Sequence, residues 1–308
     1  MATGLTGPSQ GMRGHVAMLV FSALVAGSFS LGSLVANEIA PGAIVAARFI
    51  LASVLVGAAA LTTSGIPRTA LIAPWRYFVL GGLFAVYFVL MFEGLKTAPP
   101  VSSAAVFTMT PLMAAGFGWL LMRQITTRRM AVALAIGAIG ALWVIFRADL
   151  SALLSFQVGR GELIFFVGCT AHAFYTPLIR ALNRGEPPVV FTFGTLVAGS
   201  LVMTAYAWPS LRATDWPGLA PIVWITIAYT TIFATAVTFV LVQYATLRLP
   251  SAKVMAYTYL TPSWVILWEI GLGHGVPGGM ILAGAVLTIV ALLMLLRDED
   301  GVPVSQAG

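Results

Sequence analysis

The sequence predicts an all-α membrane protein with ten transmembrane helices, arranged as two inverted five-helix repeats. Charged residues make up 8% of the 308 residues and hydrophobic residues 59%, whereas soluble domains usually carry charge on about a quarter of their residues. The hydrophobic share is roughly 180 residues, close to the ~200 that ten spanning helices of ~20 residues would use. The apolar runs are long and continuous, so they do not fit the alternating strands of a transmembrane β-barrel.

Apolar runs separated by connectors rich in Pro and Gly place the ten spans in order. We expect them near residues 16–34, 42–61, 77–95, 101–121, 130–146, 163–182, 189–208, 219–246, 252–272 and 279–296. The first is interpreted as a retained span, because no small-residue cleavage site stands out after it. The polar segment 298–308 is predicted to be a disordered cytoplasmic tail.

Two related segments, Thr97–Trp119 and Arg248–Ile270, coincide with the fourth and ninth expected spans. At an offset of 151 residues, Thr110-Pro111 in the first segment aligns with Thr261-Pro262 in the second. Paired spans that are interrupted by proline are typical of transporters built from two repeats. The first repeat is predicted to cover residues 1–147, and the second residues 160–297.

The distribution of lysine and arginine predicts the orientation in the membrane. With the N-terminus inside, 11 of the 16 Lys and Arg residues fall on the cytoplasmic side, four fall outside, and Arg48 lies within a span. Five spans per half, an odd number, insert the second half upside down relative to the first. We therefore expect a multi-pass protein of the bacterial inner membrane, with both termini cytoplasmic.

Composition also limits the partners and cofactors. The net charge of +6 is explained by cytoplasmic loops, so no nucleic-acid partner is predicted. The single cysteine, Cys169, excludes disulfides and thiolate metal sites and is interpreted as a small buried hydrophobe. We expect no metal and no cofactor; the expected partners are the lipid bilayer and a small-molecule substrate. Ala133, Gly137 and Ala141 form a small-residue face that is predicted to pack on the tenth span within a monomer, with a weak homodimer as the alternative.

Several stretches resemble the EamA family of the drug/metabolite transporter superfamily over nearly the whole chain. They are the five-plus-five layout, the stretch PGAIVAARFILAS, the two Thr-Pro segments and the stretch AHAFYTPLIRALN. Many family members carry a glutamate downstream of the proline in the fourth and ninth spans, near the places where this chain has Arg123 and His274. The lack of that glutamate, together with Gln124, is similar to the YddG branch, which exports aromatic amino acids.

The resemblance and the side-chain chemistry together indicate a substrate cavity lined by aromatic and polar groups. Aromatic faces can stack on an apolar or aromatic side chain, while hydroxyl and amide groups orient a polar end. The expected substrate-binding residues are Tyr87, Thr108, Thr110, His172, Tyr175, Phe239, Gln243, Tyr257 and Tyr259. For His172, a neutral imidazole satisfied by a neighbouring helix is the alternative interpretation.

Pro111 and Pro262 each free a backbone carbonyl and bend their helix. Because the kink recurs in both halves, we predict that these prolines are hinges that bend as the cavity opens; a fixed packing kink is the alternative. Thr110 and Thr261 are placed either to bond the freed carbonyls or to face substrate.

Charged and titratable residues near the spans indicate whether transport is coupled to a proton gradient. Arg48 is predicted to snorkel to the outer surface; pairing with Glu38, or with a carboxylate-bearing substrate, is the alternative, and the resemblance implies a structural role. Glu93, Glu162 and Glu269, like Glu38, lie near outer span ends by this topology, which leaves His172 as the deep titratable candidate. Proton-driven carriers usually need a titratable group within the membrane, so facilitated or weakly coupled export is favoured and proton antiport stays open.

These features predict an inner-membrane transporter that exports amino acids, with aromatic and other apolar ones favoured, by alternating access around a central cavity. The alternative is export of another small metabolite: threonine or homoserine, a nucleoside or a drug. No catalytic residue is predicted, because the aspartates lie outside the expected spans and the three histidines are scattered. A channel is disfavoured, since neither a filter-like carbonyl loop nor rings of charge can be recognised.

Overall fold

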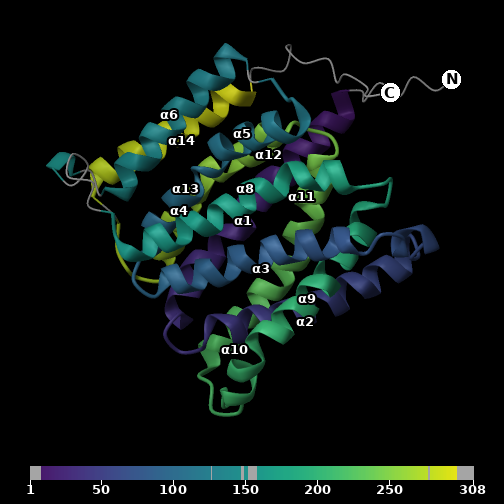
Figure 1. The fold of residues 1–308 in the computed structure, drawn as a ribbon. Helices are drawn as coiled ribbons and strands as arrows, with labels where there is room; N and C mark the ends of the chain where they lie inside the picture. The colour runs from purple at the N-terminus through teal and green to yellow at the C-terminus, as the bar shows by residue number, and fades with distance from the viewer. Residues whose placement is uncertain (1–7, 126, 147–148, 152–157, 277, 297–308) are drawn as a thin grey trace.

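The computed structural model describes residues 8–125, 127–146, 149–151, 158–276 and 278–296, and every regular element in these ranges is helical (Figure 1). The first half contains α1 (Pro8–Val35), α2 (Pro41–Thr63), η1 (Arg68–Leu71), α3 (Trp75–Leu95), α4 (Pro100–Phe107), α5 (Thr110–Met122) and α6 (Arg128–Ile145). The second half contains α8 (Arg160–Leu182), α9 (Pro188–Ala213), α10 (Pro221–Thr231), η2 (Ile232–Val237), α11 (Thr238–Thr246), α12 (Ser251–Ala256), η3 (Tyr257–Leu260), α13 (Thr261–Gly271) and α14 (Gly279–Leu296). The all-helical class is confirmed.

Nine helices in the described ranges are long and apolar enough to cross a membrane, and they match nine of the ten expected spans. In place of the expected ninth span the chain forms α12, the 3-10 turn η3 and α13 in succession. The count of ten spans and the inverted orientation of the halves therefore stay predictions. The expected tail 298–308, and the ends of the two repeats at residues 147 and 297, lie outside the described residues.

Helices of the two halves pack against one another in a regular pattern (Figure 1). The expected second span packs on the seventh (α2 with α9), the fourth on the ninth (α5 with α12), and the fifth on the tenth (α6 with α14). The third span packs on the sixth (α3 with α8), and its counterpart contact joins the first span to the eighth (α1 with α10 and α11). Exchanging the two halves leaves this set of contacts unchanged, as expected for two related repeats.

Close approach between α6 and α14 depends on glycine. A Cβ added at Gly140 would lie 2.8 Å from the backbone oxygen of Gly284, and a Cβ at Gly284 would lie 2.7 Å from a methyl carbon of Val144. The small-residue face of the fifth span was predicted to pack on the tenth span. At Gly137 this prediction is wrong, because Gly137 lies against the ring of Tyr259 in η3. The 3-10 turn brings a large aromatic side chain to this small face, whereas α14 meets α6 through Gly140.

The expected fourth and ninth spans are both broken where the aligned Thr-Pro pairs predict a kink. In the first, α4 ends at Phe107 and α5 begins at Thr110, with Pro111 in its first turn. The hydroxyl of Thr110 donates to the carbonyl of Phe107 at 2.7 Å, so the expected bond to the freed carbonyl is confirmed for this threonine. In the second, η3 precedes α13, and Pro262 lies in its first turn.

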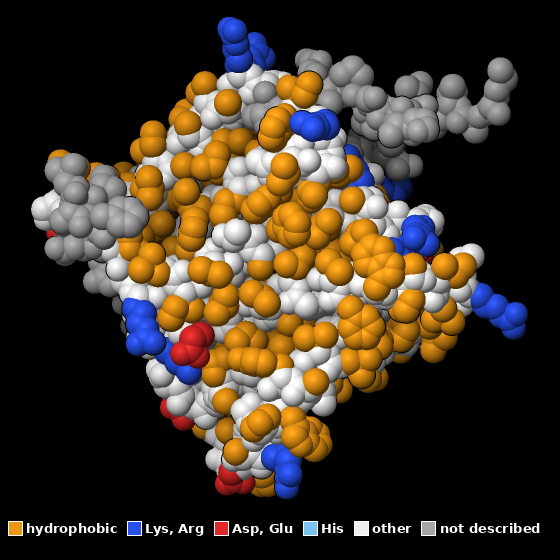
Figure 2. Space-filling view, in the orientation of Figure 1, with side chains coloured by type: hydrophobic (Ala, Val, Ile, Leu, Met, Phe, Trp, Pro, Cys, Tyr) orange, Lys and Arg blue, Asp and Glu red, His pale blue; other side chains and the backbone are white. Residues whose placement is uncertain are grey.

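The outer surface of the bundle is largely apolar. Figure 2 shows hydrophobic side chains across the middle of one face, with Lys and Arg side chains mainly near its rim. Large exposed residues such as Val54 on α2, Leu120 on α5 and Leu267 on α13 are between 57 and 65% exposed. A surface of this kind suits the hydrocarbon core of a bilayer.

Candidate functional site

A continuous group of aromatic rings lies between the two halves of the chain. Phe29 of α1 and Phe49 of α2 contact the other members of this group. The central aromatic cluster, as the term is used below, consists of eight rings: Phe84, Tyr87 and Phe88 of α3, Phe107 of α4, Phe165, His172 and Tyr175 of α8, and Phe239 of α11. All eight side chains are at most 2% exposed. The rings from α3 share one face because they stand three and four residues apart.

Phe84 is the centre of the cluster. Its ring centroid lies 4.0 Å from those of Tyr175 and Phe239, and 5.2 Å from that of His172. Tyr87 contacts the same imidazole from one turn further along α3, with the centroids 4.6 Å apart. Edge-on and tilted pairs of this kind stabilise one another beyond the area that they bury.

Polar atoms inside the cluster are left without partners. Gln243 donates from its amide nitrogen to the hydroxyl of Tyr175 at 3.1 Å, but its Oε1 accepts no hydrogen bond. The Tyr87 hydroxyl and the Nδ1 atom of His172 also have no partner. A buried polar atom without a hydrogen bond costs about 1–3 kcal/mol. Such groups in one apolar cluster are suited to binding the polar end of a small molecule.

Arg48 lies at the edge of this cluster, and the prediction that it snorkels to the surface is wrong. Its side chain is fully buried and stacks on Phe88, with Cζ 3.9 Å from the ring centroid. Nε and Nη2 donate to the hydroxyl of Thr235 at 2.9 and 2.6 Å, and Nη2 also approaches the carbonyls of Ala234 and Thr230 at 3.1 and 3.4 Å. Packing of α2 against the second half encloses this position, so the side chain has no path along the helix to water.

The element that receives Arg48 is a π-helical turn. Residues 232–237 form η2, in which the backbone hydrogen-bonding pattern of the eighth span widens between α10 and α11. Such turns occur frequently at functional sites. Here the turn presents the carbonyl of Ala234 and the hydroxyl of Thr235 to the guanidinium.

The structure brings together five of the nine expected substrate-binding residues. Tyr87, His172, Tyr175 and Phe239 belong to the central aromatic cluster, and Gln243 joins it through Tyr175. Sequence reasoning did not select the other four rings of the cluster, Phe84, Phe88, Phe107 and Phe165. The first two share the α3 helical face with Tyr87, and that periodicity was the available signal.

The other four expected residues lie on the two broken spans. Thr108 donates to the carbonyl of Ala105 within α4. The hydroxyls of Thr110 and Thr258 lie 3.2 Å apart, so the two broken spans meet at this pair.

Tyr257 contacts α1 through His15, with the phenol oxygen 3.0 Å from Nδ1. Tyr259 points away from the cluster: its ring lies against Gly137, and its hydroxyl donates to the carbonyl of Leu134 at 3.4 Å. The substrate-binding role of all nine residues, and the hinge role of Pro111 and Pro262, stay predictions.

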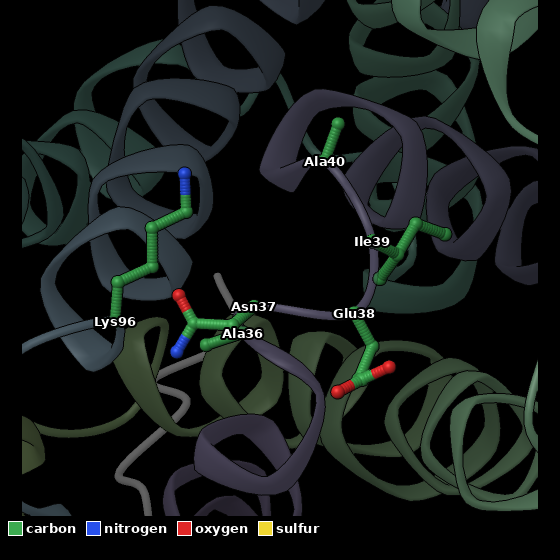
Figure 3. A pocket seen from close by; sticks show the side chains of 6 residues that line it. All are labelled: Ala36, Asn37, Glu38, Ile39, Ala40 and Lys96. Atoms are coloured by element: carbon green, nitrogen blue, oxygen red, sulfur yellow. The ribbon is translucent and has the colours of Figure 1, made fainter.

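Two surface pockets meet at the turn between α1 and α2. Figure 3 shows the first, of about 240 Å³, with Lys96 and Glu38 on opposite sides of it. Lys96 forms an ion pair with Glu93, at 2.7 Å. The second pocket, of about 380 Å³, shares Glu38 and extends to Asp215 in the connector after α9. Neither pocket is lined by a residue of the central aromatic cluster.

Comparison with known proteins gives one family and two similar proteins. The EamA-like transporter family matches residues 12–146 and 159–297. A Bacillus subtilis (strain 168) protein named "Uncharacterized transporter YyaM" is 24% identical over 282 residues, which is 91% of this chain and 92% of that protein. A solved crystal structure superposes with a TM-score of 0.69 at 19% sequence identity, covering 93% of this chain and 96% of that one, and therefore supports the fold alone.

Proposed function

The chain belongs to the EamA-like transporter family, a family of membrane transporters, and from this premise we propose that it exports amino acids by alternating access around the central aromatic cluster. The rings of the cluster would hold an aromatic or other apolar side chain. The unpartnered atoms of Tyr87, His172 and Gln243 would bind the polar end. This combination of buried rings and unpaired polar atoms is the observation that carries the proposal.

Alternating access is supported by the arrangement of the two halves. The helix contacts are unchanged when the halves are exchanged, and each half contains a span broken at a Thr-Pro pair. We propose that the halves are inverted repeats and that Pro111 and Pro262 are the hinges. Broken helices at the junction of repeats are where such transporters bind their cargo.

We place the protein in the bacterial inner membrane as a monomer or weak homodimer, with both termini cytoplasmic. Aromatic and other apolar amino acids are favoured as cargo because eight rings make up the proposed site. This agrees with the resemblance to the YddG branch. Export would be facilitated or weakly coupled, since no buried carboxylate contacts the cluster among the described residues.

An uptake screen with purified protein in liposomes tests the proposal. Liposomes preloaded with one unlabelled amino acid should accumulate the same labelled amino acid by counterflow, beginning with phenylalanine, tryptophan, methionine and threonine. Saturable counterflow of apolar amino acids is the expected result. Counterflow of nucleosides or cationic drugs, with none for any amino acid, would replace amino-acid export by the alternative cargo class.

A further inference from the structure

The positive charge of Arg48 is not compensated by any carboxylate that the structure describes. Its hydrogen bonds go to one hydroxyl and two backbone carbonyls. Among the described residues, the buried glutamates are Glu162 and Glu186. Glu162 accepts a hydrogen bond from Ser102 at 2.8 Å, and Glu186 pairs with Arg76 at 2.6 Å. A buried charge is normally paired, so the Arg48 site is complete only when an anion joins it.

One side of the Arg48 guanidinium is free. Nε and Nη2 are directed at Thr235 and the backbone of η2, whereas Nη1 is buried and has no partner. Nη1 can therefore donate a charge-assisted hydrogen bond to one carboxylate oxygen. The planar guanidinium stacks on the ring of Phe88, and Nε and Nη2 are bonded to η2. The group is therefore held in place before any ligand arrives.

A second unpartnered donor accompanies Nη1. The hydroxyl of Tyr87 is buried without a hydrogen bond, and Tyr87 precedes Phe88, the ring on which the guanidinium stacks, with the two ring centroids 4.7 Å apart. Of the other unpartnered atoms, Oε1 of Gln243 lies beside Tyr175, whereas Nδ1 of His172 belongs to an imidazole whose centroid is 4.6 Å from that of Tyr87 and 6.3 Å from that of Tyr175. The charged donor lies at the Phe88 and Tyr87 end of the cluster, and none of these groups is a carboxylate.

This inference rests on the proposed function: we propose that Nη1 of Arg48 and the hydroxyl of Tyr87 bind the carboxylate of the cargo. The cargo class is then apolar compounds with a free carboxylate, and the carboxylate is required while the amino group is dispensable. A carboxylate neutralises the buried guanidinium. A cationic amine without one would add a second positive charge to a site of low dielectric constant, where repulsion is strong.

The experiment compares three inhibitors of phenylalanine counterflow in liposomes containing the full-length protein. Unlabelled phenylalanine has both polar groups, phenylalaninamide lacks the carboxylate, and 3-phenylpropionate lacks the amine. For the wild type we expect phenylalanine and 3-phenylpropionate to inhibit at similar concentrations. Phenylalaninamide should need at least about 30-fold more, since it leaves the buried charge unpaired.

Two variants locate this preference. Arg48→Lys loses the planar fork, and Tyr87→Phe loses only the second donor while keeping its ring. In both variants, the inhibition constant of phenylalaninamide divided by that of phenylalanine should fall by about fivefold or more. Binding of phenylalanine weakens, because its carboxylate loses a donor, and binding of phenylalaninamide does not. Arg180→Lys is the matched control: Arg180 is a half-buried arginine whose partners are also backbone groups, the carbonyls of Thr246 and Leu249, but it lies outside the cluster. It should keep the wild-type ratio even if its total flux falls.

The outcomes distinguish failure of the carboxylate site from failure of the proposed function. Equal inhibition by phenylalanine and phenylalaninamide in the wild type would overturn the carboxylate site while leaving amino-acid export intact. An unchanged ratio in Tyr87→Phe would do the same, and this variant decides the question if Arg48→Lys does not fold. Absence of phenylalanine counterflow, with transport of another metabolite class, would overturn both the proposed function and the inference that rests on it.

Discussion

The guanidinium of Arg48 stacks on the ring of Phe88, with Cζ 3.9 Å from the ring centroid. A desolvated contact of this type contributes about 2 kcal/mol or more. It stabilises the charge without neutralising it, because the ring has no net charge. Together with the carbonyls of Thr230 and Ala234, it explains how α2 can carry a buried arginine next to eight aromatic residues and still keep Nη1 for a ligand.

His172→Ala should lower amino-acid flux at least about fivefold while leaving the amount of folded protein unchanged. The imidazole packs against Phe84, Tyr87 and Phe107, and its Nδ1 atom is unpartnered, so its loss removes a polar contact to substrate. The measurement is counterflow per unit of monodisperse protein. Cys169→Ala, one turn earlier on α8, is the control that should transport normally. Normal flux in His172→Ala would remove this histidine from the site.

Gly137→Ala tests where Tyr259 points. A Cβ at this position would collide with the Tyr259 ring, and overpacking of this kind costs about 1–3 kcal/mol. We expect a lower Tm for the purified protein. Gly82→Ala on α3, where nothing lies within 4 Å of the added carbon, should leave the Tm unchanged. If both variants melt like the wild type, the Tyr259 ring does not lie against α6, and a position in the substrate cavity becomes its better assignment.

The ion pair between Arg76 and Glu186 should make stability depend on pH in the acid range. Burial alone would raise the pKa of Glu186, but hydrogen bonds from the Arg76 side chain and the Arg184 backbone N–H lower the pKa below the ordinary glutamate value. A carboxyl group with a lowered pKa stabilises the fold above its unfolded pKa, and this contribution is lost as the pH falls through its folded pKa.

Glu186→Gln should therefore lower the Tm at neutral pH, because breaking a buried pair costs about 3–5 kcal/mol. The melting curves of the wild type and the variant should converge in acid, once Glu186 of the wild type is protonated. The measurement is a Tm series from neutral to acidic pH in one detergent. A difference in Tm that stays constant over the whole range would contradict the assigned role of this carboxylate.

A disulfide between the two broken spans should stop transport. The hydroxyls of Thr110 and Thr258 lie 3.2 Å apart, so cysteines at both positions are close enough to be bridged. In a Cys169→Ala background, oxidation of Thr110→Cys/Thr258→Cys should abolish counterflow, and a reducing agent should restore it. Each single cysteine variant, treated with the same oxidant, is the control. Full transport by the cross-linked protein would show that the spans do not separate here, and would favour fixed packing kinks at Pro111 and Pro262.

The sequence predicted the spans and their breaks well, because each depends on local chemistry. The expected fourth span, 101–121, lies within the observed Pro100–Met122. Proline cannot donate a backbone hydrogen bond, so Pro111 and Pro262 marked both breaks. The π-helical turn was not predicted: residues 232–237 read IFATAV, with neither proline nor glycine to mark it. The turn's hydrogen-bond partner, Arg48, lies more than 180 residues earlier in the chain.

Side-chain directions were harder to predict than spans. Arg48 lies close enough to the start of α2 to reach a membrane surface, and only the packing of the second half around α2 shows that it is enclosed. Tyr259 belongs to a 3-10 turn, whose tighter winding rotates side chains relative to an α-helix. Its ring accordingly faces Gly137 on α6, whereas Tyr87 and His172, on regular helices, face one another.

Equilibrium binding of labelled phenylalanine to purified protein tests most directly whether the central aromatic cluster is the amino-acid site. Phe84→Leu removes the ring that contacts Tyr175, His172 and Phe239, and Phe117→Leu alters a similar ring pair, with Phe174, outside the cluster. We predict saturable binding to the wild type and Phe117→Leu, and affinity at least about tenfold weaker in Phe84→Leu, as expected for loss of a stacking partner. Equal affinity in all three proteins, or no binding of phenylalanine to the wild type, would contradict the account.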